Sequence, residues 1–396
     1  MNVAFLFGSG ISRKAGFKNV SEITNIIFSG EGISRYTDSE YYFAPPLYSH
    51  IGIKEDDNVK RIVNFLNILK KYNNDYFKST KHEHETNYED IYFIVDQLDN
   101  EIYGESKNVF IREYLNKIES HHDLVLKASH RPFYSDLRFN ELISETLTYL
   151  SNIVAKLLYQ PIEDISYLNI FKEIHDDKDF EQINFFTLNH DILLEKYFDE
   201  NGLAFYDGFD IKDGDFAIFN SSLFENQKRV NLIKLHGSVD WKRYREDGKD
   251  WRGDYIAKYD VKMGIDPKDE KGRIIHSIEN KSKILIGTEN KLIEYNYELF
   301  FDLMCFFKQK LNESNYLIIS GYGFRDKGIN AKILNWFYNN DSNKIILIHK
   351  HAVKLKEFAS GAVGSKMGNW IQEKRMFVLK KWFEEVSWEE IKTYLD

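Results

Sequence analysis

Short apolar runs alternate with longer amphipathic segments along this chain. The first run covers residues 3–7, and similar runs return at 183–188, 230–235, 283–286, 316–320, 345–348 and 376–379. Between several of them, apolar residues recur three and four positions apart, at 191–199, 292–311 and 330–338. Short buried strands that alternate with helices predict an α/β fold, with a Rossmann-like, mostly parallel sheet that carries helices on both faces.

A long stretch after the first run has a helical pattern instead. Apolar residues keep helical spacing over 56–71, 88–102 and 141–159. We therefore predict an inserted helical subdomain over residues 36–179, within a sheet domain built from residues 1–35 and 180–396. Residues 242–282 have little periodicity, so we expect a long loop or a small excursion there.

The composition narrows the class of protein. The 396 residues are 43% hydrophobic and 29% charged, which is typical of a folded globular chain. The net charge of −9 offers no overall positive field, so direct nucleic-acid binding is not expected. No apolar run approaches the ~20 residues that span a bilayer, and the first residues lack the cationic start of a signal peptide. We expect a cytoplasmic protein with no membrane partner.

The single cysteine, Cys305, excludes a disulfide within the chain and any multi-cysteine zinc site. His82 and His84 have neighbouring acidic residues, but they lie in a charged stretch between two helices, so we expect no metal. Apolar helix faces that stay exposed after the helices have packed on the sheet need a second protein surface to cover them. We therefore expect a homo-oligomer that assembles through the helical subdomain.

Polar residues suited to a binding site follow several of the predicted strands. In an open parallel sheet, ligands bind beyond the carboxyl ends of the strands. Glycines there let the backbone approach a ligand, and small polar side chains supply donors and acceptors. Four strand ends carry such residues: Gly8, Ser9, Gly10, Ser12 and Gly16; Asn189, His190 and Asp191; His236 and Gly237; and Gly321, Tyr322 and Gly323.

Each of these positions also has a purely structural interpretation. The first loop has the spacing G-x-G-x5-G and not the dinucleotide fingerprint G-x-G-x-x-G, so phosphate binding and a plain glycine turn both stay open. Asp191 could bind a ligand or close an Asx turn that caps the next helix. His236 could be a general base or a structural histidine. By alternation, His190 should face away from Asn189 and Asp191.

Together, these motifs resemble those of the sirtuin family. The sirtuin pattern G-A-G-x-S followed by A-G is matched by GSGISRKAG at 8–16, T-Q-N-x-D by TLNHD at 187–191, and the catalytic H-G by residues 236–237. The Gly-Thr-Ser element has a looser counterpart at 321–324. The sirtuin I-P-x-F-R and the four zinc cysteines are missing, which disfavours protein deacylation. The sequence GYGFRD at 321–326 is similar to a sirtuin-like branch of bacterial antiphage defence.

The resemblance implies an enzyme, an NAD glycohydrolase that cleaves NAD to nicotinamide and ADP-ribose and so depletes the NAD of an infected cell. NAD is then a substrate, and no metal takes part. Asp191 would hold the nicotinamide carboxamide, Asn189 would order the ribose and the attacking water, and His236 would be the base. Gly8, Ser9, Gly10 and Ser12 would cradle the pyrophosphate, and Gly321, Tyr322 and Gly323 would lie on the adenosine side, with His349 near the adenine ribose. Gly16 and Thr187 are the other implied NAD-binding residues.

Two other functions remain open from the sequence. A non-catalytic sensor of NAD or ADP-ribose derivatives would need the glycine loops but no base, and a NAD-dependent protein deacylase is a further alternative. An always-active NADase would kill its host, so a control element is expected. The resemblance to toxic halves of two-gene systems implies a protein partner, such as a HerA-type ATPase.

Overall fold

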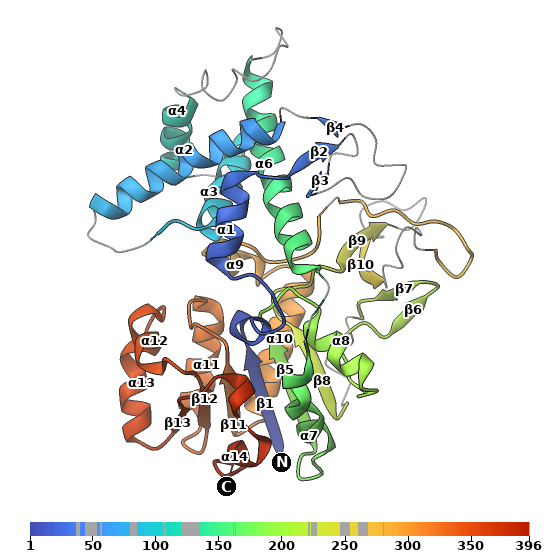
Figure 1. Ribbon diagram of the computed structural model, residues 1–396, viewed down its shortest axis with the longest axis vertical. Helices are drawn as coiled ribbons and strands as arrows, with labels where there is room; N and C mark the ends of the chain where they lie inside the picture. The colour runs from blue at the N-terminus through green and yellow to red at the C-terminus, as the bar shows by residue number, and fades with distance from the viewer. Residues whose placement is uncertain are drawn as a thin grey trace.

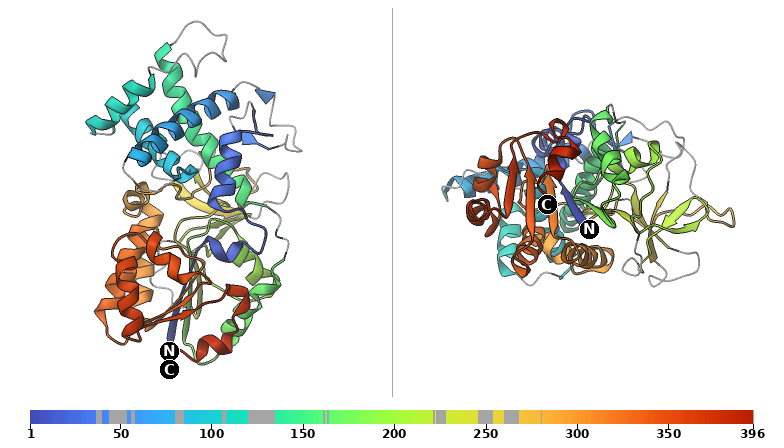
Figure 2. Two further views of the ribbon diagram at one scale, coloured as in Figure 1. Left: turned by 60° about the vertical axis from the view of Figure 1, so that its left-hand side comes forward. Right: turned by 90° about the horizontal axis from the view of Figure 1, so that it is seen from below.

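The structure is a computed structural model of the chain (Figure 1). It describes residues 1–36, 40–43, 54–55, 58–79, 85–105, 108–119, 135–160, 162, 164–220, 222, 228–245, 254–259, 268–279 and 281–395. A sheet with helices on both faces forms one end of the molecule, and a group of helices forms the other. The two chain termini lie side by side at the far end of the sheet (Figure 2).

In the described part of the chain, the central sheet has six strands in the order β13-β12-β11-β1-β5-β8. Every neighbouring pair is parallel. The predicted α/β, Rossmann-like fold is therefore confirmed. The strand order reverses between β1 and β11, where sheets of this type bind their ligands. The strands are β1 (Asn2–Phe7), β5 (Gln182–Thr187), β8 (Val230–Lys234), β11 (Tyr316–Ser320), β12 (Lys344–Ile348) and β13 (Met376–Leu379).

The strands read as continuous apolar runs because both faces of the sheet are covered. In β1, Phe5 and Phe7 point into one hydrophobic core and Ala4 and Leu6 into the other. The second core is shared with α10 (Glu298–Asn312), α11 (Lys327–Asn339) and α13 (Val363–Gln372). On the opposite face, Phe171 of α7 (Ile170–Asp176) packs with its ring centre 5.3 Å from the ring centres of Phe7 and Phe185.

The helices at the other end share the first of these cores with the sheet. They are α1 (Val20–Ser29), α2 (Asn58–Ser79), α3 (Tyr88–Ile102), α4 (Val109–Glu119) and α6 (Ser135–Leu158). Buried residues of α2, α3 and α6 belong to the same cluster as Phe7 and Phe185. The division into two domains stays a prediction. The helices and one face of the sheet share a single continuous hydrophobic core.

Three segments differ from the sequence-based expectations. Part of 242–282 is not a loop, because β9 (Trp241–Arg245) and β10 (Asp254–Tyr259) join β6 (Ile211–Asp213) and β7 (Phe216–Ile218) in an antiparallel sheet. The run at 283–286 is not a strand of the central sheet, since its amides bond to Trp241 and His236 around a turn. The helix expected over 292–311 is two helices, α9 (Asn290–Glu294) and α10, separated at 295–297.

Other short elements complete the fold. They are β2 (Ser34–Tyr36), β3 (Tyr41–Tyr42) and β4 (Lys54–Glu55) in a small antiparallel sheet, α8 (Leu193–Glu200), α12 (Ala352–Phe358), α14 (Trp388–Lys392), and the 3-10 turns η1 (Ser9–Ser12), η2 (Ser166–Asn169) and η5 (Phe383–Glu385). Among the described residues, no helix is both long and apolar enough to cross a membrane.

Charged side chains lie between α3 and α9. A carboxylate oxygen of Glu89 is 3.7 Å from Nζ of Lys291. Two turns further along α3, burial and, to a lesser extent, the charge of Glu294 raise the pKa of Asp96 from 3.8 to about 6. The contact thus combines an attractive pair with two carboxyl groups that repel each other once both are ionised.

We predict that Asp96→Asn stabilises the protein at pH 8. The folded-state pKa is raised, so the stability that Asp96 contributes is full below pH 4 and is lost as the pH rises through about 6. The variant should gain about 1 kcal/mol at pH 8 and about a third of that at pH 4.5. Urea unfolding at both pH values measures this, with Asp75→Asn on the exposed side of α2 as control. A gain independent of pH would contradict the assignment.

Candidate functional site

The loops that follow β1 and β11 touch each other directly at the point where the strand order reverses. The N–H of Gly8 donates to the carbonyl of Ser320 at 3.0 Å, and the N–H of Gly10 donates to the carbonyl of Gly321 at 3.1 Å. A Cβ on Gly8 would lie 2.6 Å from the oxygen of Gly321, and one on Gly10 would lie 2.7 Å from its Cα. Gly321 itself has φ of 67°. Glycine is therefore required by the packing of the two backbones.

This packing changes what the first loop can offer a phosphate. The resemblance implied that backbone N–H groups at Gly8 and Gly10 face the pyrophosphate, but both already donate to the loop after β11. Ser9 and Gly10 are exposed at the tip of the turn. Across from it, a Cβ on Gly323 would meet nothing within 4 Å. Ser9 and Gly323 are thus the positions of these loops with room for a ligand beside them.

Ser12, Asn189 and Asp191 form a buried hydrogen-bonded cluster. The Ser12 hydroxyl donates to Oδ2 of Asp191 at 2.8 Å and accepts from Nδ2 of Asn189 at 2.9 Å. Nδ2 of Asn189 also donates to the carbonyl of Gly8 at 3.2 Å. The structure therefore brings three of the predicted site residues together, from the ends of the two neighbouring strands β1 and β5. Both amide protons of Asn189 are engaged, so its Oδ1 is the atom left for a ligand.

Asp191 also has the structural role that its position suggested. Its Oδ1 accepts from the N–H of Leu193 at 3.1 Å, which closes the expected Asx turn before α8. Burial raises the pKa of Asp191, and the nearby charge of Lys234 opposes that shift. Lys234 donates to the backbone carbonyl of Asp191 and pairs with Glu195 at 3.0 Å. Thr187 accepts from the N–H of Asn189 at 3.1 Å and so fixes the same turn.

His236 follows β8 directly and forms a second cluster with Tyr295 and Asp326. Its Nε2 lies 2.6 Å from the Tyr295 hydroxyl and 3.3 Å from Oδ2 of Asp326. The Tyr295 hydroxyl lies 2.6 Å from the same Oδ2. Burial lowers the pKa of His236, while the hydrogen bond to Asp326 acts in the opposite direction. Burial also raises the pKa of Tyr295 well above its usual value.

Asp326 stays ionised within this buried cluster. Burial alone would raise its pKa, but the hydrogen bond from His236, the charge of Lys291 and the hydrogen bond from Tyr295 bring it well below its usual value. Its second oxygen, Oδ1, accepts from the N–H of Ile329 at 2.9 Å and caps α11. Sequence reasoning placed Asp326 in a motif but gave it no role. Tyr295 was missed because it appeared to lie inside one long helix.

The other predicted residues are distributed around these clusters. His190 points away from Asn189 and Asp191, and its ring centre is 6.1 Å from that of His236. The Tyr322 ring is buried in the core and its hydroxyl donates to Asn330 at 2.8 Å, so its side chain does not line a ligand surface. His349 lies beyond β12, where its Nδ1 accepts from the N–H of His351 at 3.0 Å.

Residues of the predicted insertion hold the first glycine loop. The Tyr167 hydroxyl donates to the carbonyl of Ile11 at 2.6 Å. Nε2 of Gln160 donates to the carbonyl of Gly16, whose φ is 89°. The loop is therefore fixed from two sides, by the loop after β11 and by side chains that come just before β5 in the chain.

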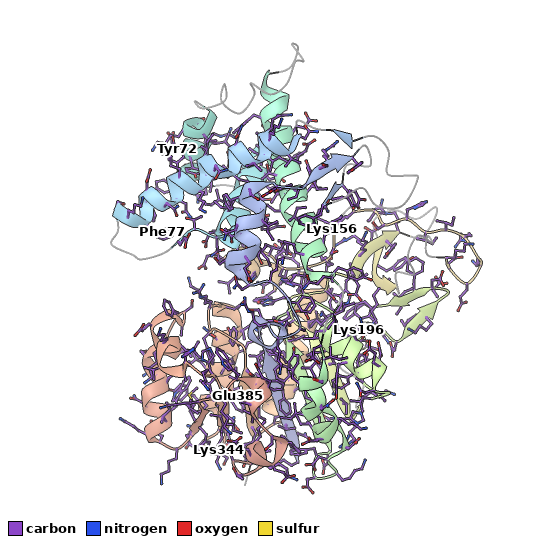
Figure 3. All side chains as sticks on the ribbon, viewed as in Figure 1. Tyr72, Phe77, Lys156, Lys196, Lys344 and Glu385 are labelled. Carbon is purple, nitrogen blue, oxygen red and sulfur yellow. The ribbon has the colours of Figure 1, made fainter. Side chains whose placement is uncertain are left out.

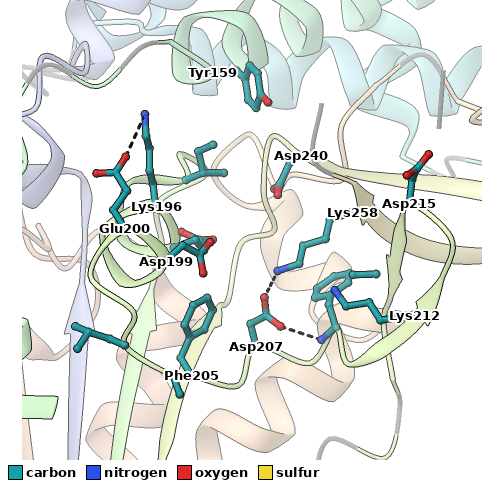
Figure 4. A pocket seen from close by; sticks show the side chains of 16 residues that line it. Tyr159, Lys196, Asp199, Glu200, Phe205, Asp207, Lys212, Asp215, Asp240 and Lys258 are labelled. Atoms are coloured by element: carbon teal, nitrogen blue, oxygen red, sulfur yellow. Dashed lines mark hydrogen bonds and ion pairs between the residues drawn. The ribbon is translucent and has the colours of Figure 1, made fainter. Parts of the chain in front are cut away.

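A separate cavity of about 810 Å³ lies beside α8 and the antiparallel sheet of β6, β7, β9 and β10 (Figure 4). Lys258 pairs with Asp207, and Lys196 lies 3.9 Å from Glu200. The two phosphates of a dinucleotide would be repelled by the excess of carboxylates, so this cavity is a poor site for NAD. The charged residues described in its lining are Glu195, Asp199, Glu200, Asp207, Asp215 and Asp240, against Lys196, Lys212 and Lys258.

Among the described residues, no group of three or more His, Cys, Asp or Glu side chains is placed to hold a metal ion. His82 and His84 lie outside the described residues.

We predict that Gly10→Ala lowers the thermal unfolding temperature and that Gly323→Ala does not. The added methyl at Gly10 meets the backbone of Gly321 at 2.7 Å, whereas the space beside Gly323 is open. Overpacking against backbone costs about 1–3 kcal/mol, and differential scanning calorimetry of both variants measures it. Equal unfolding temperatures for Gly10→Ala and the wild type would show that the two loops do not pack as described.

Comparison with known proteins agrees with this arrangement. Residues 183–360 match the family model for a SIR2-like domain. The match starts at β5 and includes Asn189, Asp191, His236 and Asp326. The loop after β1 lies outside the match, but β1 pairs in parallel with β5, so this loop lies beside the matched residues. No curated protein matches the chain significantly. The predicted resemblance to sirtuins is thus confirmed for these residues, and the chain carries a SIR2-like domain.

Proposed function

We propose that this protein is an NAD glycohydrolase that binds NAD at the reversal of strand order and releases nicotinamide and ADP-ribose. A SIR2-like domain points to NAD-related activity. The observation that carries the proposal is the position of Asn189 and His236. They follow the neighbouring parallel strands β5 and β8, at the same carboxyl ends of the strands where both glycine loops lie.

The polar groups of the two clusters suit this reaction. Breaking the nicotinamide–ribose bond forms an oxocarbenium-like centre, so the site must hold the ligand in place and bring water to C1′ of the ribose. Oδ1 of Asn189, in an amide fixed by Ser12 and Gly8, can orient that water or a ribose hydroxyl. Asp191 would hold the carboxamide, and His236 would accept the proton.

The proposed reaction balances without a redox step. The glycosidic bond breaks with its electron pair going to the ring nitrogen, which leaves neutral nicotinamide. The water oxygen forms the new bond to C1′ and gives up one proton to His236, which passes it to solvent. NAD and water thus yield nicotinamide, ADP-ribose and one proton.

A non-catalytic sensor of NAD or ADP-ribose derivatives is the second candidate. It is favoured by the burial of His236, which is 4% exposed, and by the hydrogen bonds that already occupy its Nε2. A protein deacylase is the weaker alternative, because the single cysteine cannot build the four-cysteine zinc module that the family's deacylases carry. The His–Tyr–Asp cluster favours the enzyme, since a protein that only binds needs no such base.

We predict that Asn189→Ala and His236→Ala each lower the rate of NAD cleavage by roughly 100-fold or more, because each removes a group that acts at the reacting centre. Release of nicotinamide from NAD by each purified variant measures the rate. Asn67→Ala, which removes an exposed amide on α2, serves as the control.

Wild-type cleavage by a folded Asn189→Ala or His236→Ala variant would contradict the assigned roles. A wild-type protein that binds NAD in calorimetry without cleaving it would support the sensor and sink the glycohydrolase.

Depletion of NAD in an infected cell remains the proposed biological role, in keeping with the resemblance of GYGFRD at 321–326 to a motif of sirtuin-like antiphage proteins. Such an activity has to be controlled, and a protein partner such as a HerA-type ATPase stays a prediction. So does self-assembly through the helices, which is supported by an apolar groove of about 390 Å³ between α2, α3 and α4. Tyr72 of this groove is labelled in Figure 3, and Phe110 beside it is 78% exposed.

We predict that Phe110→Lys reduces the oligomer size, because a charge would replace the most exposed aromatic ring at the groove. Light scattering at micromolar concentration measures the mass, with Val353→Lys on exposed α12 as control. A wild-type mass of 46.9 kDa across this range would refute assembly.

A further inference from the structure

We propose that Asp326 and Tyr295 are positioning residues that hold the proton of neutral His236 on Nε2 and leave Nδ1 as the basic nitrogen. The part of this inference that concerns turnover rests on the proposed NAD cleavage. The part that concerns the histidine does not.

The hydrogen-bond geometry determines where the protons lie. Tyr295 has one hydroxyl proton and lies 2.6 Å both from Oδ2 of Asp326 and from Nε2 of His236. An ionised carboxylate can only accept, so the tyrosine proton points to Asp326. The tyrosine oxygen must then accept from His236, which requires a proton on Nε2. Oδ2 of Asp326, 3.3 Å from Nε2, is a second acceptor for the same proton.

The tautomer follows from these two acceptors. A neutral imidazole carries one proton, and the nitrogen without it keeps the lone pair. With Nε2 protonated, Nδ1 is the nitrogen that can accept a proton from water or a ribose hydroxyl. The imidazolium formed in that step would be stabilised through Nε2 by the charge of Asp326, as an orienting carboxylate stabilises a catalytic histidine.

The carboxylate of Asp326 is held in a fixed position. Its Oδ1 is engaged by the N–H of Ile329 at the start of α11, which leaves Oδ2 directed at His236. Two residues earlier, Phe324 has φ of 53°, a left-handed conformation that is costly for a bulky side chain. Its carbonyl accepts from Asn330 at 2.8 Å and from the N–H of Ser360 at 2.7 Å. These bonds stabilise the strained turn that precedes Asp326 and so help to hold its carboxylate beside His236.

The other ionisable groups around His236 raise or lower its pKa. Asp326 and, from α3, Glu89 favour the protonated ring, while Lys291 disfavours it. The buried His190 lies with its ring centre 6.1 Å away, and Tyr295 closes the remaining side. If the Asp326 charge is removed, less negative charge offsets the effect of Lys291 on the ring. The pKa of His236 should therefore fall.

The first test needs no NAD. In ¹⁵N-histidine NMR of the full chain, the His236 signals, assigned by their loss in His236→Gln, should show the Nε2–H tautomer. Asp326→Asn keeps a good helix cap and removes the charge, so it should shift the His236 pKa downward. An Nδ1–H tautomer in the wild type, or an unchanged pKa in a folded Asp326→Asn variant, would overturn the proposal.

The second test measures NAD cleavage. Tyr295→Phe, which removes one oxygen atom, and Asp326→Asn should each lower kcat by roughly 10- to 100-fold and leave KM within about threefold. In Asp326→Asn, the acidic limb of the pH profile should move to lower pH. Tyr149→Phe is the matched control, because it removes a buried hydroxyl that donates to the carbonyl of Ile27 among the helices.

The outcomes of the two tests are separable. Faster cleavage by Tyr295→Phe would mean that the tyrosine blocks the histidine, and it would overturn the positioning role. A wild-type protein that shows the Nε2–H tautomer but cleaves no NAD would support the histidine assignment and contradict the proposed function alone.

Discussion

The site depends on the contact between two backbones that have no side chain between them. Gly8 and Gly10 meet Gly321 so closely that a Cβ on any of the three would lie within 3 Å of a backbone atom of the facing loop. Because of this contact, the loops after β1 and β11 form a single hydrogen-bonded unit at the reversal of strand order. Ser12 follows one turn later and is thereby placed against Asn189 and Asp191.

Alternation along the chain after β5 divides the polar groups into two clusters. Asn189 and Asp191 face Ser12, whereas His190 faces His236. The Ser12 cluster is a fixed set of donors and acceptors beside the glycine loops, and the His236 cluster contains the titratable groups. A ligand that spans both would have its polar groups ordered on one side and a base on the other, which is the division of tasks that cleavage of a glycosidic bond requires.

The strands and motifs were predictable from the sequence because they follow local periodicity and spacing. The errors have identifiable causes. Leu285 and Ile286 are apolar because they are buried in different cores, although their backbone runs around a turn beside Trp241 and not along the sheet. The break between α9 and α10 leaves no mark in the apolar pattern, so Tyr295 could not be assigned to the site. Its hydrogen bonds join residues 59 and 31 positions away in the chain, and such contacts depend on the tertiary fold.

The most direct measurement of the central claim is to incubate the purified full chain with NAD and quantify the products by chromatography and mass spectrometry. We expect nicotinamide and ADP-ribose to appear in equal amounts, as NAD disappears and water supplies the new hydroxyl. Intact NAD after prolonged incubation of the folded, NAD-bound protein would contradict the claim that this SIR2-like domain is a glycohydrolase.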